Sequence, residues 1–196
     1  KRGVLALSSN YALYADMSDR MMAILGRQAP EQEVYSVDEC FLGLAGFARR
    51  DLAAWGREIR RQVRRWTGLP VGVGIGATRT LAKLANHIAK TAERKPGVYP
   101  AHLAQVCALG QLSAAEQQAL FEATAVGEVW GVGRRIGQRL AAARARIAAV
   151  HLGCFDGAVG HEVAAGHEMH DVLAGRVGAG DPCGAVDHPR VEQIAN

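Results

Sequence analysis

The spacing of hydrophobic residues predicts three helices in the first hundred positions. Apolar residues recur every three or four positions over 11–25 and again over 51–66. Glycine and proline follow both repeats, as is common at helix ends. A third repeat runs to Ala92, and either Thr78 or Thr80 is placed to cap its start. These three segments are therefore expected to be amphipathic helices.

Strand-like segments lie between these helices. Residues 34–44 form a mostly apolar run, and Val4 to Ser8 is typical of the end of a short strand. In the segment 69–78, Val71, Val73 and Ile75 alternate with glycines, so one face is packed and the other is bare enough for another backbone or a ligand. The order predicts an α/β sandwich in which helices cover one face of a sheet.

A second unit is expected after the Pro- and Gly-rich segment 96–100. Its apolar spacing is mostly helical, and it contains VWGVGRRIGQRL at 129–140. Beyond Ala145 the periodicity weakens, and the final residues are typical of a linker.

Composition narrows the class of protein. The chain has 196 residues, 49% of them hydrophobic, which suits one or two packed domains. There is no apolar run near the roughly 18 residues of a membrane span and no signal-peptide pattern, so a cytoplasmic location without membrane contact is expected. The cysteines form no CxxC pair and are expected to be reduced thiols, at Cys40, Cys107, Cys154 and Cys183.

The charge is unevenly distributed. The net charge is +4, and the first 140 residues hold 19 Lys and Arg against 12 Asp and Glu. A basic first part followed by an acidic tail is compatible with nucleic-acid binding.

Two adjacent carboxylates, Asp38 and Glu39, interrupt the apolar run 34–44. Burying an unpaired carboxylate costs several kcal/mol, so a cation or a metal ion is the expected partner. Adjacent residues on a regular strand point to opposite faces, so both acids reach one ion only if the chain turns or bulges there. The alternative is an exposed tight turn with two solvated acids, which is the usual explanation of an isolated Asp-Glu pair.

Four segments together carry a family resemblance: SSNYALYADMSDRM, YSVDECFLGLAG, GLPVGVGIGATRTLAKLANHIAK and VWGVGRRIGQRL. A weaker fifth is GDPC at 180–183. In order and spacing they resemble the Y-family translesion DNA polymerases, most closely the UmuC-type branch. The resemblance implies an α/β (α+β) palm with helices on one face of a mainly antiparallel sheet, and a small helical thumb with a helix-hairpin-helix. It places the end of the fingers and the palm at 1–100, the thumb at 101–175 and a linker toward a little-finger domain at 176–196.

The resemblance also assigns residues. It implies that Asp38 and Glu39 are catalytic and bind two Mg²⁺ ions, which activate the primer hydroxyl and stabilise the triphosphate oxygens. Lys90 would contact the incoming triphosphate. Its neighbours on the same helix face, Lys83 and His87, are expected to be solvated. The glycines and arginines of VWGVGRR would bind the DNA backbone without reading bases, at Gly131, Gly133, Arg134 and Arg135.

The implied activity is error-prone translesion synthesis in SOS DNA repair, on primer-template DNA with dNTP substrates. A UmuD-type dimer, RecA and the sliding clamp are the implied partners. The family's third carboxylate and its steric gate lie upstream of the SSNY motif, and residues 147–180 depart from the family pattern. This polypeptide alone is therefore expected to incorporate no nucleotide. One alternative is a non-catalytic DNA-binding or assembly module, and another is a nucleotidyl cyclase, which the hairpin motif disfavours.

Two further clusters are expected to have no binding role. The arginine face of the helix over 51–66 is expected to be a solvated surface on the back of the sheet. The histidines at 161, 167 and 170, with Glu162 and Glu168, match no HExxH spacing and are not expected to bind a metal.

Overall fold

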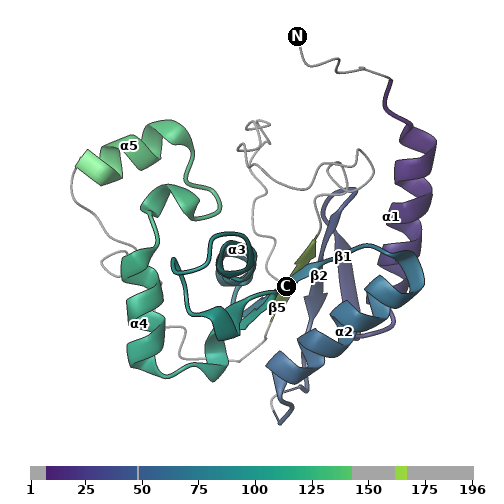
Figure 1. The fold of residues 1–196 in the computed structure, drawn as a ribbon, viewed down its shortest axis with the longest axis horizontal. Coiled ribbons are helices and arrows are strands. Elements are labelled where there is room, and N and C mark those ends of the chain that lie inside the picture. Colours follow the sequence, from purple (N-terminus) through teal and green to yellow (C-terminus); the bar gives the residue numbers. More distant parts are fainter. Residues whose placement is uncertain (1–7, 48, 143–161, 167–196) are drawn as a thin grey trace, which may run out of the picture.

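The computed structural model describes residues 8–47, 49–142 and 162–166, and it combines a five-stranded sheet with five helices among these residues (Figure 1). Short 3-10 turns lie at Ala101–Leu103, Leu109–Gln111 and Val126–Glu128. In chain order the elements are α1 (Tyr11–Leu25), β1 (Glu31–Val34), β2 (Glu39–Gly43), α2 (Leu52–Thr67), β3 (Gly72–Gly76), α3 (Arg79–Arg94), β4 (Val106–Ala108), α4 (Ala114–Ala123), α5 (Arg134–Ala142) and β5 (Glu162–Gly166).

The first three helices form where the hydrophobic spacing predicts them, and each has a side-chain cap. Asn10 and Asp51 accept hydrogen bonds from backbone N–H groups in the first turns of α1 and α2. Of the two threonines considered for α3, Thr78 is the cap. Gly68 ends α2 in the left-handed conformation, with φ of 77°.

The strand order is β1-β2-β5-β3-β4. Only the β3–β4 pairing is parallel, which confirms a mainly antiparallel sheet. The strand-like run 34–44 is divided, because β1 ends at Val34 and β2 begins at Glu39. The division puts a turn at the two adjacent acids, as the resemblance to the family implies. The N–H groups of Tyr35 and Ser36 both donate to the Glu39 carbonyl, at 3.0 and 3.1 Å, and close a hairpin between the two strands.

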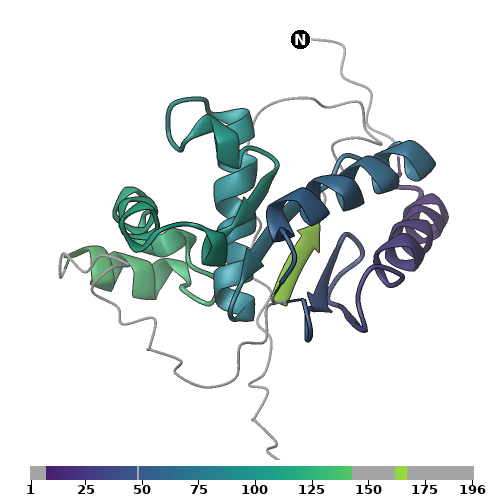
Figure 2. The same cartoon turned by 90° about the horizontal axis from the view of Figure 1, so that it is seen from below.

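Helices cover both faces of the sheet, so the expectation that they cover one face is wrong. Helices α1 and α2 lie on the opposite side of the sheet from α3 (Figures 1 and 2). Strand β3 explains the arrangement, because Val73 and Ile75 join the core with α1 and α2 while its glycines face α3. A Cβ at Gly74 would come within 2.1 Å of the Asn86 backbone nitrogen. The bare face of β3 therefore accepts another backbone.

The strand β5 comes from a part of the chain that the sequence assigns to the helical second unit. It lies in the middle of the sheet, antiparallel to both β2 and β3. One row of the sheet pairs Glu39 with Gly166 and Gly166 with Gly72. Several predictions fall outside the described residues: most of the strand end Val4 to Ser8, the histidines at 161, 167 and 170, Cys154, Cys183 and the linker. The proposed domain boundaries stay a prediction.

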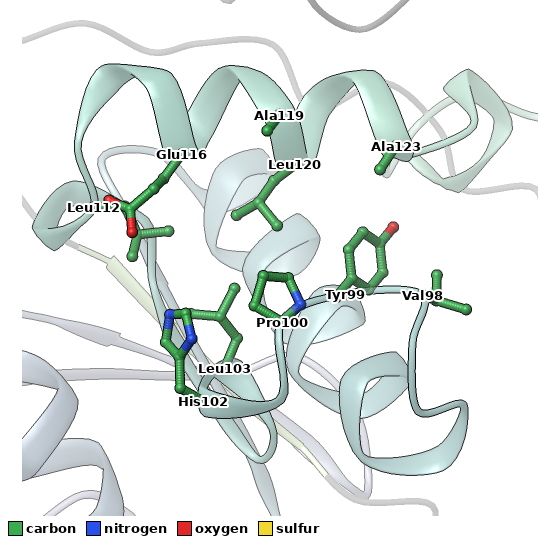
Figure 3. A pocket seen from close by; sticks show the side chains of 10 residues that line it. All are labelled: Val98, Tyr99, Pro100, His102, Leu103, Leu112, Glu116, Ala119, Leu120 and Ala123. Carbon is green, nitrogen blue, oxygen red and sulfur yellow. The ribbon is translucent and has the colours of Figure 1, made fainter.

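Helix α4 packs on the far side of α3. Its start has a capping box, in which Ser113 and Glu116 each bond the other's backbone N–H. Leu120 is buried with Tyr99 and Leu103 in the core that α3 shares with β4. A mostly apolar cavity of about 240 Å³ remains between α4 and the segment 98–103 (Figure 3). The described part of the chain contains no helix long and apolar enough to cross a membrane.

Candidate active site

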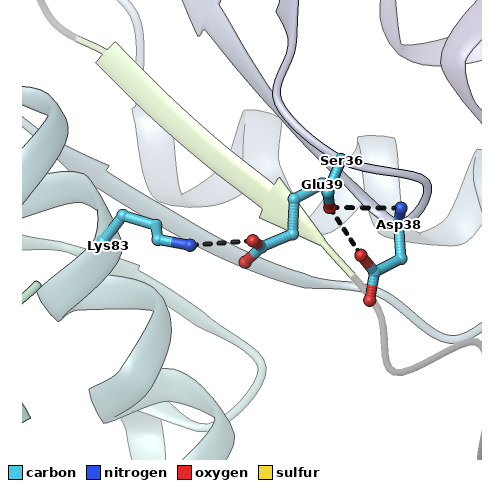
Figure 4. A network of polar contacts seen from close by, with 4 residues as sticks. All are labelled: Ser36, Asp38, Glu39 and Lys83. Carbon is cyan, nitrogen blue, oxygen red and sulfur yellow. Dashed lines mark hydrogen bonds and ion pairs between the residues drawn. The ribbon is translucent and has the colours of Figure 1, made fainter. Parts of the chain in front are cut away.

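The two predicted acids lie at the end of the β1–β2 hairpin loop. The Asp38 carboxylate accepts a 2.6 Å hydrogen bond from the Ser36 hydroxyl, which itself accepts from the Asp38 N–H at 3.4 Å (Figure 4). Glu39 is the first residue of β2, and its Oε2 accepts from the Lys83 ammonium at 2.8 Å. The hairpin therefore supplies the turn that two adjacent acids need to serve one site.

The surroundings of these acids are less buried than the apolar run 34–44 suggests. Val34 and Val37 are 56% and 52% exposed, and only the residues after Glu39 enter the core. The side chains of Asp38 and Glu39 are partly buried. The expected need for a cationic partner is nevertheless met for Glu39, because its carboxylate is paired with Lys83.

Lys83 is not a solvated lysine, so that expectation is wrong. Its side chain is 18% exposed, and Nζ lies 5.0 Å from the centre of the Tyr35 ring and 5.7 Å from that of Trp130. The ammonium therefore contacts one carboxylate and two aromatic faces.

The neighbouring His87 is also partly enclosed, which again differs from the solvated face expected. Its Nδ1 lies 3.5 Å from a Glu128 carboxylate oxygen, and its ring meets Tyr99 edge to face at 6.4 Å. Burial lowers the pKa of His87, because a charged imidazole loses solvation there, and the Glu128 carboxylate opposes this effect.

Lys90 lies two turns beyond Lys83 on α3. It is partly buried, and its side chain passes over β3, where a Cβ at Gly72 would be 3.2 Å from the Lys90 Cγ. Gly72 is two strands from Glu39 in the same sheet row, and so about 10 Å away. The structure thus places Lys90 on the sheet face covered by α3, two strands away from Glu39.

The segment with the proposed DNA-binding residues reaches the same hairpin through Trp130. The Trp130 ring lies 5.7 Å from that of Tyr35 and 5.9 Å from that of Phe41. Gly131 follows with φ of 88°, a left-handed conformation that favours glycine. The Gly133 carbonyl accepts from the Gly137 N–H at 2.8 Å, so Gly133 caps the start of α5.

The backbone N–H groups in the first turn of α5 have no hydrogen-bond acceptor within the helix itself. Arg134 and Arg135 begin this helix and are exposed. The described residues therefore bring together the acidic hairpin, Lys83 and the tryptophan that precedes the arginines. Sequence reasoning missed the roles of Lys83 and Trp130. The available signals were the seven-residue spacing from Lys83 to Lys90 and the position of Trp130 inside VWGVG.

The donor chemistry of the hairpin fits a hard divalent cation. Asp38 and Glu39 offer carboxylate oxygens, which Mg²⁺ commonly combines with phosphate oxygens and water. Residues 8–47, 49–142 and 162–166 contain no group of three or more His, Cys, Asp or Glu arranged to hold a metal ion. A cation at this hairpin would therefore need further ligands from substrate or solvent.

Comparisons with known proteins agree with the motifs. Residues 1–87 match the impB/mucB/samB family. UmuC of Salmonella typhimurium is 47% identical over 141 residues, covering 71% of this chain and 31% of that protein. The chain is a homologue of the UmuC-type, Y-family DNA polymerases. MucB of Escherichia coli is 44% identical over 142 residues, again 31% of its length. The resemblance seen in the sequence motifs is thereby confirmed.

More distant relatives extend the comparison. DNA polymerase IV of Corynebacterium diphtheriae is 33% identical over 135 residues, covering 67% of this chain and 26% of that protein. The chain shares its fold with a Dbh DNA polymerase solved as an insertion ternary complex, with a TM-score of 0.56 and 20% identity over 72% of this chain and 38% of the other. This UmuC homologue thus spans about a third of the length of the relatives named first.

Proposed function

We propose that this UmuC homologue contributes the metal-binding and nucleotide-binding part of an error-prone translesion DNA polymerase. The observation that carries the proposal is the hairpin geometry, in which Asp38 and Glu39 lie at the turn between β1 and β2, beside Lys83 and the Trp130 segment. The chemistry would be transfer of a nucleotidyl group from a dNTP to the primer 3′ end, directed by a template. Its cellular setting would be the SOS response to DNA damage.

Asp38 and Glu39 would hold Mg²⁺, with two ions in the intact enzyme. When bound, such ions lower the pKa of the primer hydroxyl and neutralise charge on the triphosphate oxygens. Ser36 would fix the orientation of the Asp38 carboxylate through its 2.6 Å hydrogen bond. Lys90 would bind the triphosphate as a point charge from the helix that covers this face of the sheet.

Gly131, Gly133, Arg134 and Arg135 would bind the DNA backbone in a helix-hairpin-helix formed by α4, α5 and their connection. The N-terminal N–H groups of α5 and the two arginine charges are suited to phosphate oxygens. Contacts of this kind position a duplex without specifying its sequence. A UmuD-type dimer, RecA and the sliding clamp are proposed partners through the resemblance alone.

A chimera tests this assignment. Residues 8–142 would replace the matching part of Salmonella typhimurium UmuC, which is 47% identical, and Mg²⁺-dependent primer extension past an abasic site would be measured. We expect extension by the chimera and a loss of about 100-fold or more with Asp38→Asn or Glu39→Gln, provided that circular dichroism shows both variants folded. Unchanged extension by either variant would contradict the proposed roles.

The 196-residue chain by itself is expected to incorporate no nucleotide. Its described residues bring only two carboxylates, Asp38 and Glu39, to the turn of the hairpin, and the Glu39 carboxylate is paired with Lys83. Mg²⁺-dependent synthesis by this chain alone would overturn that expectation.

The pairing of Glu39 with Lys83 also favours a second candidate function, a non-catalytic module that binds DNA or an assembly partner. Salt-dependent DNA binding together with an inactive chimera would support this alternative.

A further inference from the structure

The Lys83 ammonium is bound to the Glu39 carboxylate, which is one of the two carboxylates that a metal ion at this hairpin would use. Its Nζ lies 2.8 Å from the Glu39 Oε2, and the two side chains are only 18% and 23% exposed. A charge-assisted hydrogen bond of this length uses a lone pair that a metal ion would also need. Because both groups are shielded from water, the pair is screened less than a surface ion pair.

The aromatic rings beside Lys83 keep its ammonium near the acid. Tyr35 and Trp130 lie 5.0 and 5.7 Å from Nζ, within the range of a cation–π contact. The two rings also contact each other edge to face at 5.7 Å. The lysine is therefore enclosed by the hairpin and by the segment that precedes α5.

We propose that Lys83 is an internal counter-ion that competes with a divalent cation for the Glu39 carboxylate. The inference rests on the proposed function, because it concerns the same metal site. In the metal-free protein the ammonium neutralises Glu39 and stabilises the hairpin against α3. A cation that binds Glu39 displaces the ammonium from this carboxylate and so changes its position relative to the Tyr35 and Trp130 rings.

Lys83 also connects the acidic hairpin to the segment that precedes α5. Lys83 contacts Glu39 on one side and Trp130 on the other, so its position depends on both elements. Metal binding at the hairpin is thereby coupled to the segment that carries Gly131 and Gly133. Coupling of this kind requires a group that contacts both elements and has two arrangements.

The experiment measures the dissociation constant of Mn²⁺, added without nucleotide, by electron paramagnetic resonance of the free ion. Lys83→Met removes the competing charge and is expected to bind Mn²⁺ about tenfold more tightly than the wild type. Lys83→Arg keeps the charge and is expected to stay near the wild-type value. Circular dichroism establishes whether each variant is folded. If Lys83→Met does not fold, Lys83→Gln takes its place.

Lys95→Met is the matched control. It removes the same charge from the exposed end of α3, about 18 Å along the helix from Lys83, and is expected to leave the affinity within twofold of wild type. An equal gain in Lys95→Met would show a general effect of net charge and overturn the proposal.

Asp38→Asn distinguishes failure of the counter-ion proposal from failure of the proposed metal site. Equal affinities of wild type and Lys83→Met, both lost with Asp38→Asn, would overturn the counter-ion alone. Binding that survives Asp38→Asn in every background, or no binding by any variant, would overturn the metal site and the counter-ion together.

Discussion

Replacing Gly74 by alanine should push α3 away from the sheet and destabilise the fold. A Cβ on Gly74 would lie 2.1 Å from the Asn86 nitrogen and 2.3 Å from the Ala82 carbonyl oxygen. Both atoms belong to the backbone of α3, so no side-chain rotation relieves the overlap. The helix would have to retreat by on the order of 1 Å, which would loosen the packing of Leu84 and Ile88. Overpacking of this kind costs about 3 kcal/mol.

Urea unfolding followed by circular dichroism measures this cost. With a slope of about 2 kcal/mol per molar urea, a loss of 3 kcal/mol lowers the midpoint by about 1.5 M. Gly127→Ala is the matched control, because a Cβ there meets nothing within 4 Å, and its midpoint should stay within about 0.3 M of wild type. Equal midpoints for Gly74→Ala and wild type would refute the close contact between α3 and β3.

Three other results are expected. Ser113→Ala removes the capping box of α4 and should lower the free energy of unfolding by about 1 kcal/mol, seen as a fall of several degrees in Tm, and an unchanged Tm would contradict this. Burial raises the pKa of Cys107 to about 12, so its thiol keeps its proton when the unfolded chain loses it near pH 9. Stability should therefore fall as pH rises from 9 toward 12, and a Cys107→Ala variant should show a shallower decline. The lowered pKa of His87 has the opposite sign, so its contribution is present above pH 6.5 and is lost as pH falls below that value. His87→Gln should reduce the loss of folding stability below pH 6.5. An unchanged loss in this variant would argue against the burial of His87.

Local structure was predictable because it is encoded in neighbouring residues. The helix 11–25 combines a regular apolar repeat with a capping residue at its start, and the structure has it at those bounds. The glycine at position 68 stops α2 as expected, because it adopts a left-handed conformation that other residues rarely adopt. Such signals depend on a few adjacent positions, so one sequence is enough to read them.

Pairings between distant segments were not predictable in the same way. The run 34–44 looks like one strand because Val34, Tyr35 and Val37 are apolar, yet these residues are exposed around a hairpin. The central position of β5 depends on hydrogen bonds to β2 and β3, which lie more than 80 residues away in the chain. No periodicity in 162–166 identifies those partners.

The sequence identified the acidic residues of the site but not the residues that contact them. Asp38 and Glu39 are conspicuous because carboxylates are rare among apolar neighbours. The role of Lys83 depends on tertiary packing, since its partner Glu39 is 44 residues away in the sequence. Lysines on a helix face usually extend into water, so a solvated Lys83 was the natural expectation and only the fold reverses it.

The claim that the hairpin acids bind a divalent cation is tested most directly by paramagnetic broadening of backbone amide NMR signals with Mn²⁺. The account predicts that substoichiometric Mn²⁺ broadens the amides of Ser36 to Cys40 first, and that the Asp38→Asn, Glu39→Gln double variant loses this pattern. Broadening centred elsewhere, or the same pattern in the double variant, would contradict the account.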